Sequence, residues 1–140
     1  MNNSFAGLQA SVLFALKVLI DPDGPTNHGM LGPVHIDAPE ASVVNASFPA
    51  ATAARAQTCQ RIIDVILGAL APAVPERVIA ACNGANGVAT FSGEGPDGQY
   101  YLYMETIGGG AGGRSYQDGS DGIQVHVTNT SNLPLSLIHI

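Results

Sequence analysis

The strongest constraint on the fold is a glycine-rich loop between two segments of β-type sequence. Residues 101–107 form the first segment, and residues 108–113 contain five glycines in six positions. Residues 123–130 form the second β-type segment. Glycine permits positive φ angles and close backbone approach, at an entropic cost. So many glycines favour a site or an unusual backbone crossing over a simple reversal, with a flexible connector as the alternative.

The composition indicates a folded chain whose surface carries unusually few charges. Its 140 residues suggest one domain. They are 46% hydrophobic and only 11% charged, whereas soluble domains average about 25% charged residues. The chain is too apolar for a disordered segment. We therefore expect part of its surface to be covered by more chain or by another subunit.

The charge and the cysteines exclude several classes of partner. The net charge is −6, and the basic residues are only Lys17, Arg55, Arg61, Arg77 and Arg114. No basic stripe results, so we expect neither a nucleic-acid partner nor an anionic membrane surface. Cys59 and Cys82 lack the spacing of a metal-binding pair, and in a domain of this size they indicate free thiols in a reducing, cytoplasmic setting.

Two segments have the pattern of helices. Residues 5–20 are apolar on nearly every face, which predicts a helix buried on several sides. This run is too short for a membrane-spanning helix and is not followed by a cleavage site. Residues 51–71 carry one apolar stripe at helical spacing, and Pro72 ends the pattern.

The rest of the chain predicts short strands separated by turns. Residues 33–37 and 43–45 have an extended pattern, and residues 88–91 and 99–106 predict a hairpin around a glycine-rich turn. The unbroken apolar run 100–104 predicts burial on both faces of its strand. The fold class is therefore α+β, with two apolar helices packed against a mixed or antiparallel sheet.

The glycine loop does not match the standard phosphate-binding motifs. A P-loop requires a lysine after its glycines, and the only lysine of the chain is Lys17. A dinucleotide fingerprint requires a helix directly after the glycines, and residues 114–119 do not predict one. Successive backbone N–H groups of such a loop can still form a nest for an anion.

His126 is the best candidate for acid–base chemistry. It lies on the polar face of the segment 123–130, where an imidazole serves as a general base, as a ligand or as a hydrogen-bonded structural residue. Glu105 would orient this imidazole if the two segments pair, and otherwise it is a solvated carboxylate. His28 and His35 have no partners at ligand spacing, so no metal site is predicted. Cys59 and Cys82 are interpreted as buried thiols rather than nucleophiles.

Several motifs in one order resemble a known family. Residues 103–110 resemble its aromatic-Glu-Thr-Ile-Gly-Gly-Gly signature, and residues 118–122 and 126–130 resemble its Asp-Gly-x-Asp-Gly and His-Met-Thr-Asn-Thr motifs. Further upstream, residues 38–50 resemble its Ala-Pro-Glu-Gly-Ser-x-x-Asn-x-x-Phe-Pro-Ala segment, and residues 60–70 resemble its helix. The family is hydantoinase B/oxoprolinase, which includes the B-type subunits of N-methylhydantoinase and related ketone-carboxylase subunits.

This resemblance implies the ATP-dependent opening of a cyclic amide such as 5-oxoproline or a hydantoin. It implies an A-type partner that uses ATP, a hetero-oligomer, and a divalent metal whose ligands lie upstream of the matched segment. It also implies that residues 1–134 are an internal piece of a larger domain and that residues 135–140 are an off-pattern tail. Residues 83–87 depart from the family's Gln-Gly-x-Met-Asn-Asn loop, which leaves the substrate open.

We accordingly place the candidate site around the glycine loop and His126. The predicted catalytic residues are Glu105, Asp121 and His126, and the predicted substrate-binding residues are Thr106, Gly108, Gly109, Gly110 and Asn129. Two alternatives stay open: a ketone-carboxylase subunit that uses ATP and bicarbonate, and a non-catalytic assembly module.

Overall fold

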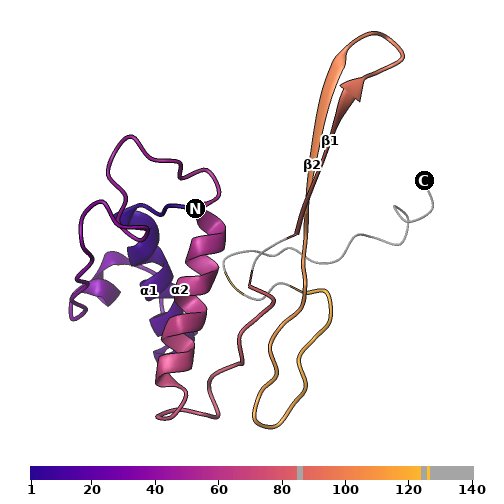
Figure 1. Ribbon diagram of the computed structural model, residues 1–140. Helices are drawn as coiled ribbons and strands as arrows, with labels where there is room; N and C mark the ends of the chain where they lie inside the picture. Colours follow the sequence, from indigo (N-terminus) through magenta and orange to yellow (C-terminus); the bar gives the residue numbers. More distant parts are fainter. Residues whose placement is uncertain (85–86, 124–125, 127–140) are drawn as a thin grey trace.

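The described part of the chain forms two helices, a short 3-10 turn and one hairpin (Figure 1). The computed structural model describes residues 1–84, 87–123 and 126. The elements follow in the order α1 (Phe5–Ile20), η1 (His28–Leu31), α2 (Arg55–Leu70), β1 (Gly87–Glu94) and β2 (Tyr100–Ile107). The α+β class is confirmed, and both predicted helices form. Within the described residues, no helix is long and apolar enough to cross a membrane.

Helices α1 and α2 lie side by side and bury the core between them (Figure 1). Helix α1 begins after Ser4, whose hydroxyl accepts a hydrogen bond from the Gly7 N–H at 3.2 Å. Such an N-cap satisfies one of the unpaired donors at the start of a helix. The buried core consists of apolar side chains from both helices and from the segment after α2, namely Ala15, Leu19, Ile63, Leu67 and Val78.

Strands β1 and β2 form an antiparallel hairpin. The register pairs Gly87 with Ile107 at one end and Glu94 with Tyr100 at the other. The turn closes through a 2.8 Å hydrogen bond from the Gly95 N–H to the Gln99 carbonyl. The predicted hairpin and its turn are therefore confirmed.

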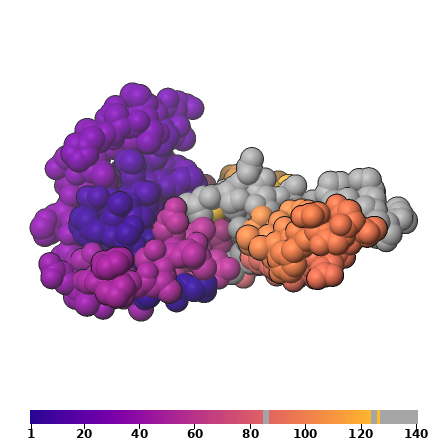
Figure 2. Space-filling view, turned by 90° about the horizontal axis from the view of Figure 1, so that it is seen from above, coloured from indigo at the N-terminus to yellow at the C-terminus, as the bar shows by residue number. Residues whose placement is uncertain are grey.

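The predicted burial of residues 100–104 is wrong. Every side chain in this run is exposed, from 47% for Tyr103 to 70% for Tyr100. The hairpin extends away from the helices, and the space-filling view shows the two parts at opposite ends of the molecule (Figure 2). The helices pack on each other rather than on the sheet, so no described layer covers either face of the hairpin.

The glycine loop forms the middle layer of a backbone crossing. On one side the Ala80 N–H donates to the Gly113 carbonyl at 2.8 Å, and on the other the Ala111 N–H donates to the Ser120 carbonyl at 2.8 Å. The approach is so close that a Cβ on Gly112 would lie 1.9 Å from the Ala80 carbonyl oxygen. The glycines are therefore needed where three stretches of backbone meet.

Two smaller predictions differ from the structure. Residues 33–37 form no strand, and residues 43–45 belong to a turn closed by the isolated bridge between Ser42 and Asn45. Neither segment pairs with a described strand that could accept its backbone hydrogen bonds. The predicted strand 123–130 falls mostly outside the described residues, which here include only Ile123 and His126.

Candidate active site

Three potentially reactive side chains meet beside α2. His126 Nε2 lies 3.0 Å from Asp64 Oδ1, and His126 Nδ1 lies 3.9 Å from Cys82 Sγ. The imidazole is only 1% exposed, and Cys82 is 7% exposed. The Phe14 ring of α1 lies 6.3 Å from the imidazole, centroid to centroid. The imidazole thus lies next to a carboxylate and a thiol, away from bulk water.

The position of Asp64 is set by several contacts. It lies on α2, and its second carboxylate oxygen pairs with Arg61 one turn earlier. The backbone N–H of Cys82 donates to Asp64 Oδ1 at 3.5 Å, and the Arg61 guanidinium reaches the Cys82 carbonyl at 3.5 Å. These contacts tie the segment after α2 to the helix. They hold the carboxylate and the thiol close to the imidazole, the carboxylate near Nε2 and the thiol near Nδ1.

This order of groups is that of a carboxylate, a base and a proton donor. In the tautomer whose Nε2–H donates to Asp64, Nδ1 carries no proton and is the ring nitrogen near the Cys82 thiol. A carboxylate that fixes the tautomer and orientation of an imidazole leaves its other nitrogen free to accept a proton. The arrangement can therefore remove a proton from the Cys82 thiol or from a water in its place.

The same three residues offer potential metal ligands. One ligand atom from each of Asp64, Cys82 and His126 lies within 4.8 Å of the others. The two ring nitrogens have different neighbours, however, and one ion binds only one of them. An ion held by Cys82 Sγ and His126 Nδ1 would leave Asp64 as the carboxylate that orients the ligand histidine, a common arrangement around bound metals. The described residues thus fit a partial ligand set.

The structure places Glu105 in a different environment from His126. Its carboxylate accepts hydrogen bonds from the Tyr103 hydroxyl and from the Thr106 N–H, both exposed. The hydrogen bond to Glu105, with further contributions from desolvation and charge repulsion, raises the pKa of the Tyr103 phenol above its ordinary value. The carboxylate that contacts His126 is therefore Asp64, and the conditional pairing of Glu105 with His126 is not what the structure shows.

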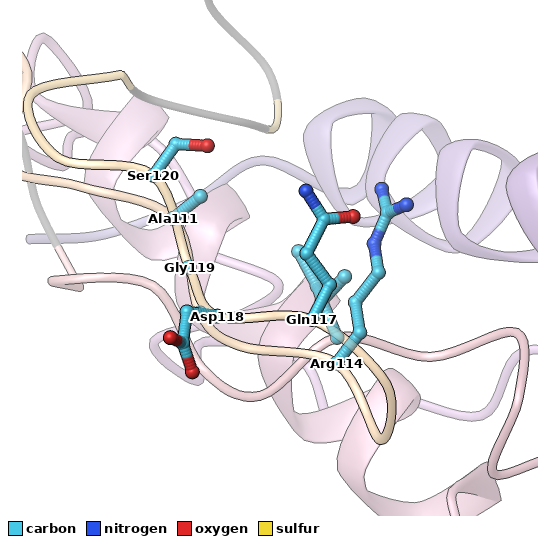
Figure 3. A pocket seen from close by; sticks show the side chains of 8 residues that line it. Ala111, Arg114, Gln117, Asp118, Gly119 and Ser120 are labelled. Carbon is cyan, nitrogen blue, oxygen red and sulfur yellow. The ribbon is translucent and has the colours of Figure 1, made fainter.

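Two other predicted site residues meet at the glycine loop. Gly110 and Asp121 form an antiparallel bridge, while Gly108 is buried and Gly109 is exposed. A cavity of about 110 Å³ lies beside this bridge, lined by loop residues that include Arg114, Gln117 and Ser120. Figure 3 shows Arg114 and Gln117 projecting in one direction and Asp118 in the other. Asn129 lies outside the described residues.

Sequence reasoning missed Asp64 and Cys82 as members of the site. They lie 62 and 44 residues from His126 along the chain, and 18 residues from each other. No motif spacing connects such positions, because only the packing of α2 against the segment after it brings them together. One signal was available: a carboxylate among the mainly apolar residues in the second half of α2 needs a partner.

The chain matches one protein family over nearly its whole length. The family model described as hydantoinase B/oxoprolinase matches residues 1–138. The chain belongs to the hydantoinase B/oxoprolinase family. This confirms the resemblance drawn from the motifs in residues 103–110 and 118–130.

The relatives carry names that agree with this family. An uncharacterized protein of Methanocaldococcus jannaschii is 43% identical over 113 residues, which are 80% of this chain and 19% of that protein. A Pseudomonas sp. protein, provisionally named as the B-type subunit of a D-/L-hydantoinase, is 37% identical over 79% of this chain and 18% of its own length. A protein of Arabidopsis thaliana named 5-oxoprolinase 1 is 37% identical over 86% of this chain and 9% of its own length.

The chain spans less than a fifth of each of these relatives. No solved structure matches it significantly.

Proposed function

We propose that this chain is part of the B-type subunit of an ATP-dependent cyclic-amide hydrolase. The substrate would be a hydantoin or 5-oxoproline, and an A-type partner would supply the ATP-dependent activation in the same cytoplasmic complex. The family match and the names of the relatives support this proposal. The observation that supports a mechanism for this hydrolysis is the buried contact between Asp64 and His126.

In this proposal His126 acts as the general base for ring opening. Asp64 accepts a hydrogen bond from the Nε2–H of the imidazole, so Nδ1 takes a proton from the water that attacks the activated amide carbon. The bond between this carbon and the ring nitrogen then breaks, and the imidazolium gives the proton to the leaving nitrogen. A base held in position by a carboxylate contributes through orientation as well as basicity. Cys82 lies near the same nitrogen. Either its thiol donates the proton to Nδ1, or the attacking water binds next to it and donates the proton instead.

The residues around the glycine loop keep a substrate-binding role in this proposal. Thr106, Gly108, Gly109, Gly110 and Asn129 would bind the cyclic amide, and Glu105 and Asp121 would add polar or acid–base groups. Backbone N–H groups of the loop would stabilise the negative charge that develops on the carbonyl oxygen. The bridge between Gly110 and Asp121 supports this role, because it fixes the loop backbone.

A divalent metal is part of the proposal at family level only. Of this chain's residues, Cys82 and His126 Nδ1 would hold it, with Asp64 as the orienting carboxylate, and this use of Nδ1 is an alternative to its role as general base. When bound, such an ion would polarise the amide carbonyl.

Substitutions in the complete subunit, assayed with its A-type partner, test the role of His126. We expect His126→Ala to lower turnover about 100-fold or more, in line with the contribution of a general base. Asp64→Asn should lower kcat with little change in KM, because it disturbs the base rather than substrate binding. Turnover that survives both substitutions would refute this assignment.

Two further variants sharpen the result. Cys82→Ala separates the two uses of His126: activity is retained if water is the proton donor, and it is lost if the thiol is required. Glu105→Gln serves as a matched carboxylate variant, since its contacts are with Tyr103 and Thr106. We expect it to reduce turnover less than Asp64→Asn.

A ketone-carboxylase subunit is the second candidate, and it is favoured by the departure of residues 83–87 from the family loop. Labelled bicarbonate distinguishes the two reactions, because only a carboxylase retains the label in its product. A non-catalytic assembly module would show no ATP-dependent turnover of either substrate class in the complete complex.

A further inference from the structure

Two of the five basic side chains line one cavity together with His126. The cavity has a volume of about 210 Å³ and opens between α1, α2 and the segment after α2. Arg77 and Arg114 contribute its positive charges. Its remaining walls are apolar and consist of Phe14, Val18, Leu67 and Ile79. Pockets for drug-sized ligands measure roughly 300–1,000 Å³, so this one has room for a small ring compound and not for a nucleotide.

Both arginines keep donors available for a ligand. Arg77 Nη1 donates to the Leu19 carbonyl at 2.9 Å, and Arg114 Nη1 approaches the Tyr116 hydroxyl at 3.4 Å. Across residues 1–84, 87–123 and 126, neither guanidinium has a carboxylate within ion-pair distance, whereas Arg61 is paired with Asp64. Each guanidinium carries five N–H donors, so one neutral contact leaves most of them unused.

The charges around the cavity favour an anion. Among the described residues, no carboxylate lines it; Asp64 contacts the His126 imidazole without lining the cavity, and Glu76 lines a neighbouring hollow that also includes Arg77 and Arg114. The whole chain has a net charge of −6. The two arginines have no ion-pair partner in the described part of the chain. The cavity is therefore a positively charged region of a negatively charged protein.

The geometry points to an anion-binding subsite formed by Arg77 and Arg114 next to His126. It would take a carboxylate or phosphate group on a small ring compound, with the ring against the apolar walls and the anion on the guanidinium groups. Arginine is suited to both anions because its planar fork donates two parallel hydrogen bonds. This inference rests on the proposed function for the identity of the ring, a cyclic amide, and not for the anion itself.

Binding to the complete subunit tests the subsite without depending on turnover. The probes are 5-oxoproline, the neutral lactam of the same ring size that lacks the carboxylate, and inorganic phosphate. Calorimetry would measure each with the parent protein and with Arg77→Gln and Arg114→Gln. A charge-assisted hydrogen bond contributes about 1.5–3 kcal/mol, so each variant should lose at least about tenfold in affinity for the anion that the subsite binds.

The outcomes identify the anion or overturn the proposal. Weakened binding of 5-oxoproline, with unchanged binding of the neutral lactam, supports a carboxylate subsite. Weakened binding of phosphate alone supports a phosphate subsite. Unchanged affinity for both anions in both variants overturns the inference. A complex that binds anions through these arginines but turns over no cyclic amide would refute the proposed function and leave the subsite standing.

A matched variant controls for loss of folding. Arg55 lies at the opposite end of α2 from Leu67 and is exposed. Arg55→Gln removes the same charge without touching the cavity, so its anion affinities should equal those of the parent. Arg77→Gln also removes the hydrogen bond to Leu19, which is why Arg114→Gln, whose contact is with an exposed tyrosine, is the second test.

Discussion

The helical pair and the hairpin have similarly apolar sequences but opposite burial. Ile63 of α2 is completely buried and Leu67 is 4% exposed, whereas Leu102 and Met104 of β2 are 64% and 65% exposed. The helices present apolar stripes to each other, so each provides the surface that the other needs. The hairpin has no described partner layer (Figure 2). An apolar run therefore indicates that a segment favours burial, but whether it is buried depends on a neighbouring element.

The largest expected effect comes from one leucine in each region. Leu67→Ala should lower the free energy of unfolding by about 2–5 kcal/mol, because it leaves a cavity between the helices. Leu102→Ala should change it by less than about 0.5 kcal/mol, because this side chain is already in solvent. Urea denaturation followed by circular dichroism measures both. Equal losses would break the comparison and would mean that the hairpin is covered in solution.

The glycine loop extends the comparison to backbone packing. Gly112→Ala should cost about 1–3 kcal/mol, because the added methyl group would meet the Ala80 carbonyl and force the crossing apart. Gly68→Ala is the control, since a Cβ at this helical position meets nothing within 4 Å. It should stabilise α2 by roughly 0.5–1 kcal/mol. Thermal denaturation of the two variants should therefore give shifts of opposite sign.

A smaller effect is expected at the start of α1. Ser4→Ala removes the hydroxyl that accepts from the Gly7 N–H, and it should cost about 1 kcal/mol. Ser92→Ala, on the exposed strand β1, should be nearly neutral. If both substitutions had the same effect on the urea midpoint, the cap would contribute nothing to the helical region.

The smallest prediction concerns the hairpin and changes a pKa rather than the fold. Glu105→Gln should lower the pKa of Tyr103 toward its ordinary value near 10, because the charged acceptor of its hydroxyl is lost. Since folding raises this pKa, the contribution of the pair to stability is complete below the ordinary value and is lost as pH rises through the raised value. Ultraviolet absorbance of tyrosinate measures the titration. Glu94→Gln, on the paired strand, should leave Tyr103 unchanged.

The sequence predicted local elements better than their surroundings. The helix 5–20 and the hairpin around residues 93–98 follow from apolar periodicity and turn residues, and both form. The second helix begins at Arg55 rather than at residue 51. Its N-cap residue, Ala54, makes no side-chain hydrogen bond, so no capping side chain indicates the start in the sequence. The strands expected at residues 33–37 and 43–45 do not form, since an extended segment needs a partner that local sequence does not specify.

The candidate site was likewise only partly predictable from the sequence. The motif in residues 103–110 and the histidine at position 126 identified the family, and the family model confirms it. Asp64, Cys82 and the arginine-lined cavity could not be predicted, because their members are far apart along the chain.

The sequence by itself determined the family, the α+β class, the two helices and the hairpin. Each of these follows from residues within one segment, or from motifs in a fixed order. Only the tertiary structure decided that Asp64 rather than Glu105 contacts His126, that the glycines serve a backbone crossing, and that the aromatic strand is exposed. These outcomes depend on which segments pack together, and packing is set by the sum of many contacts between distant residues.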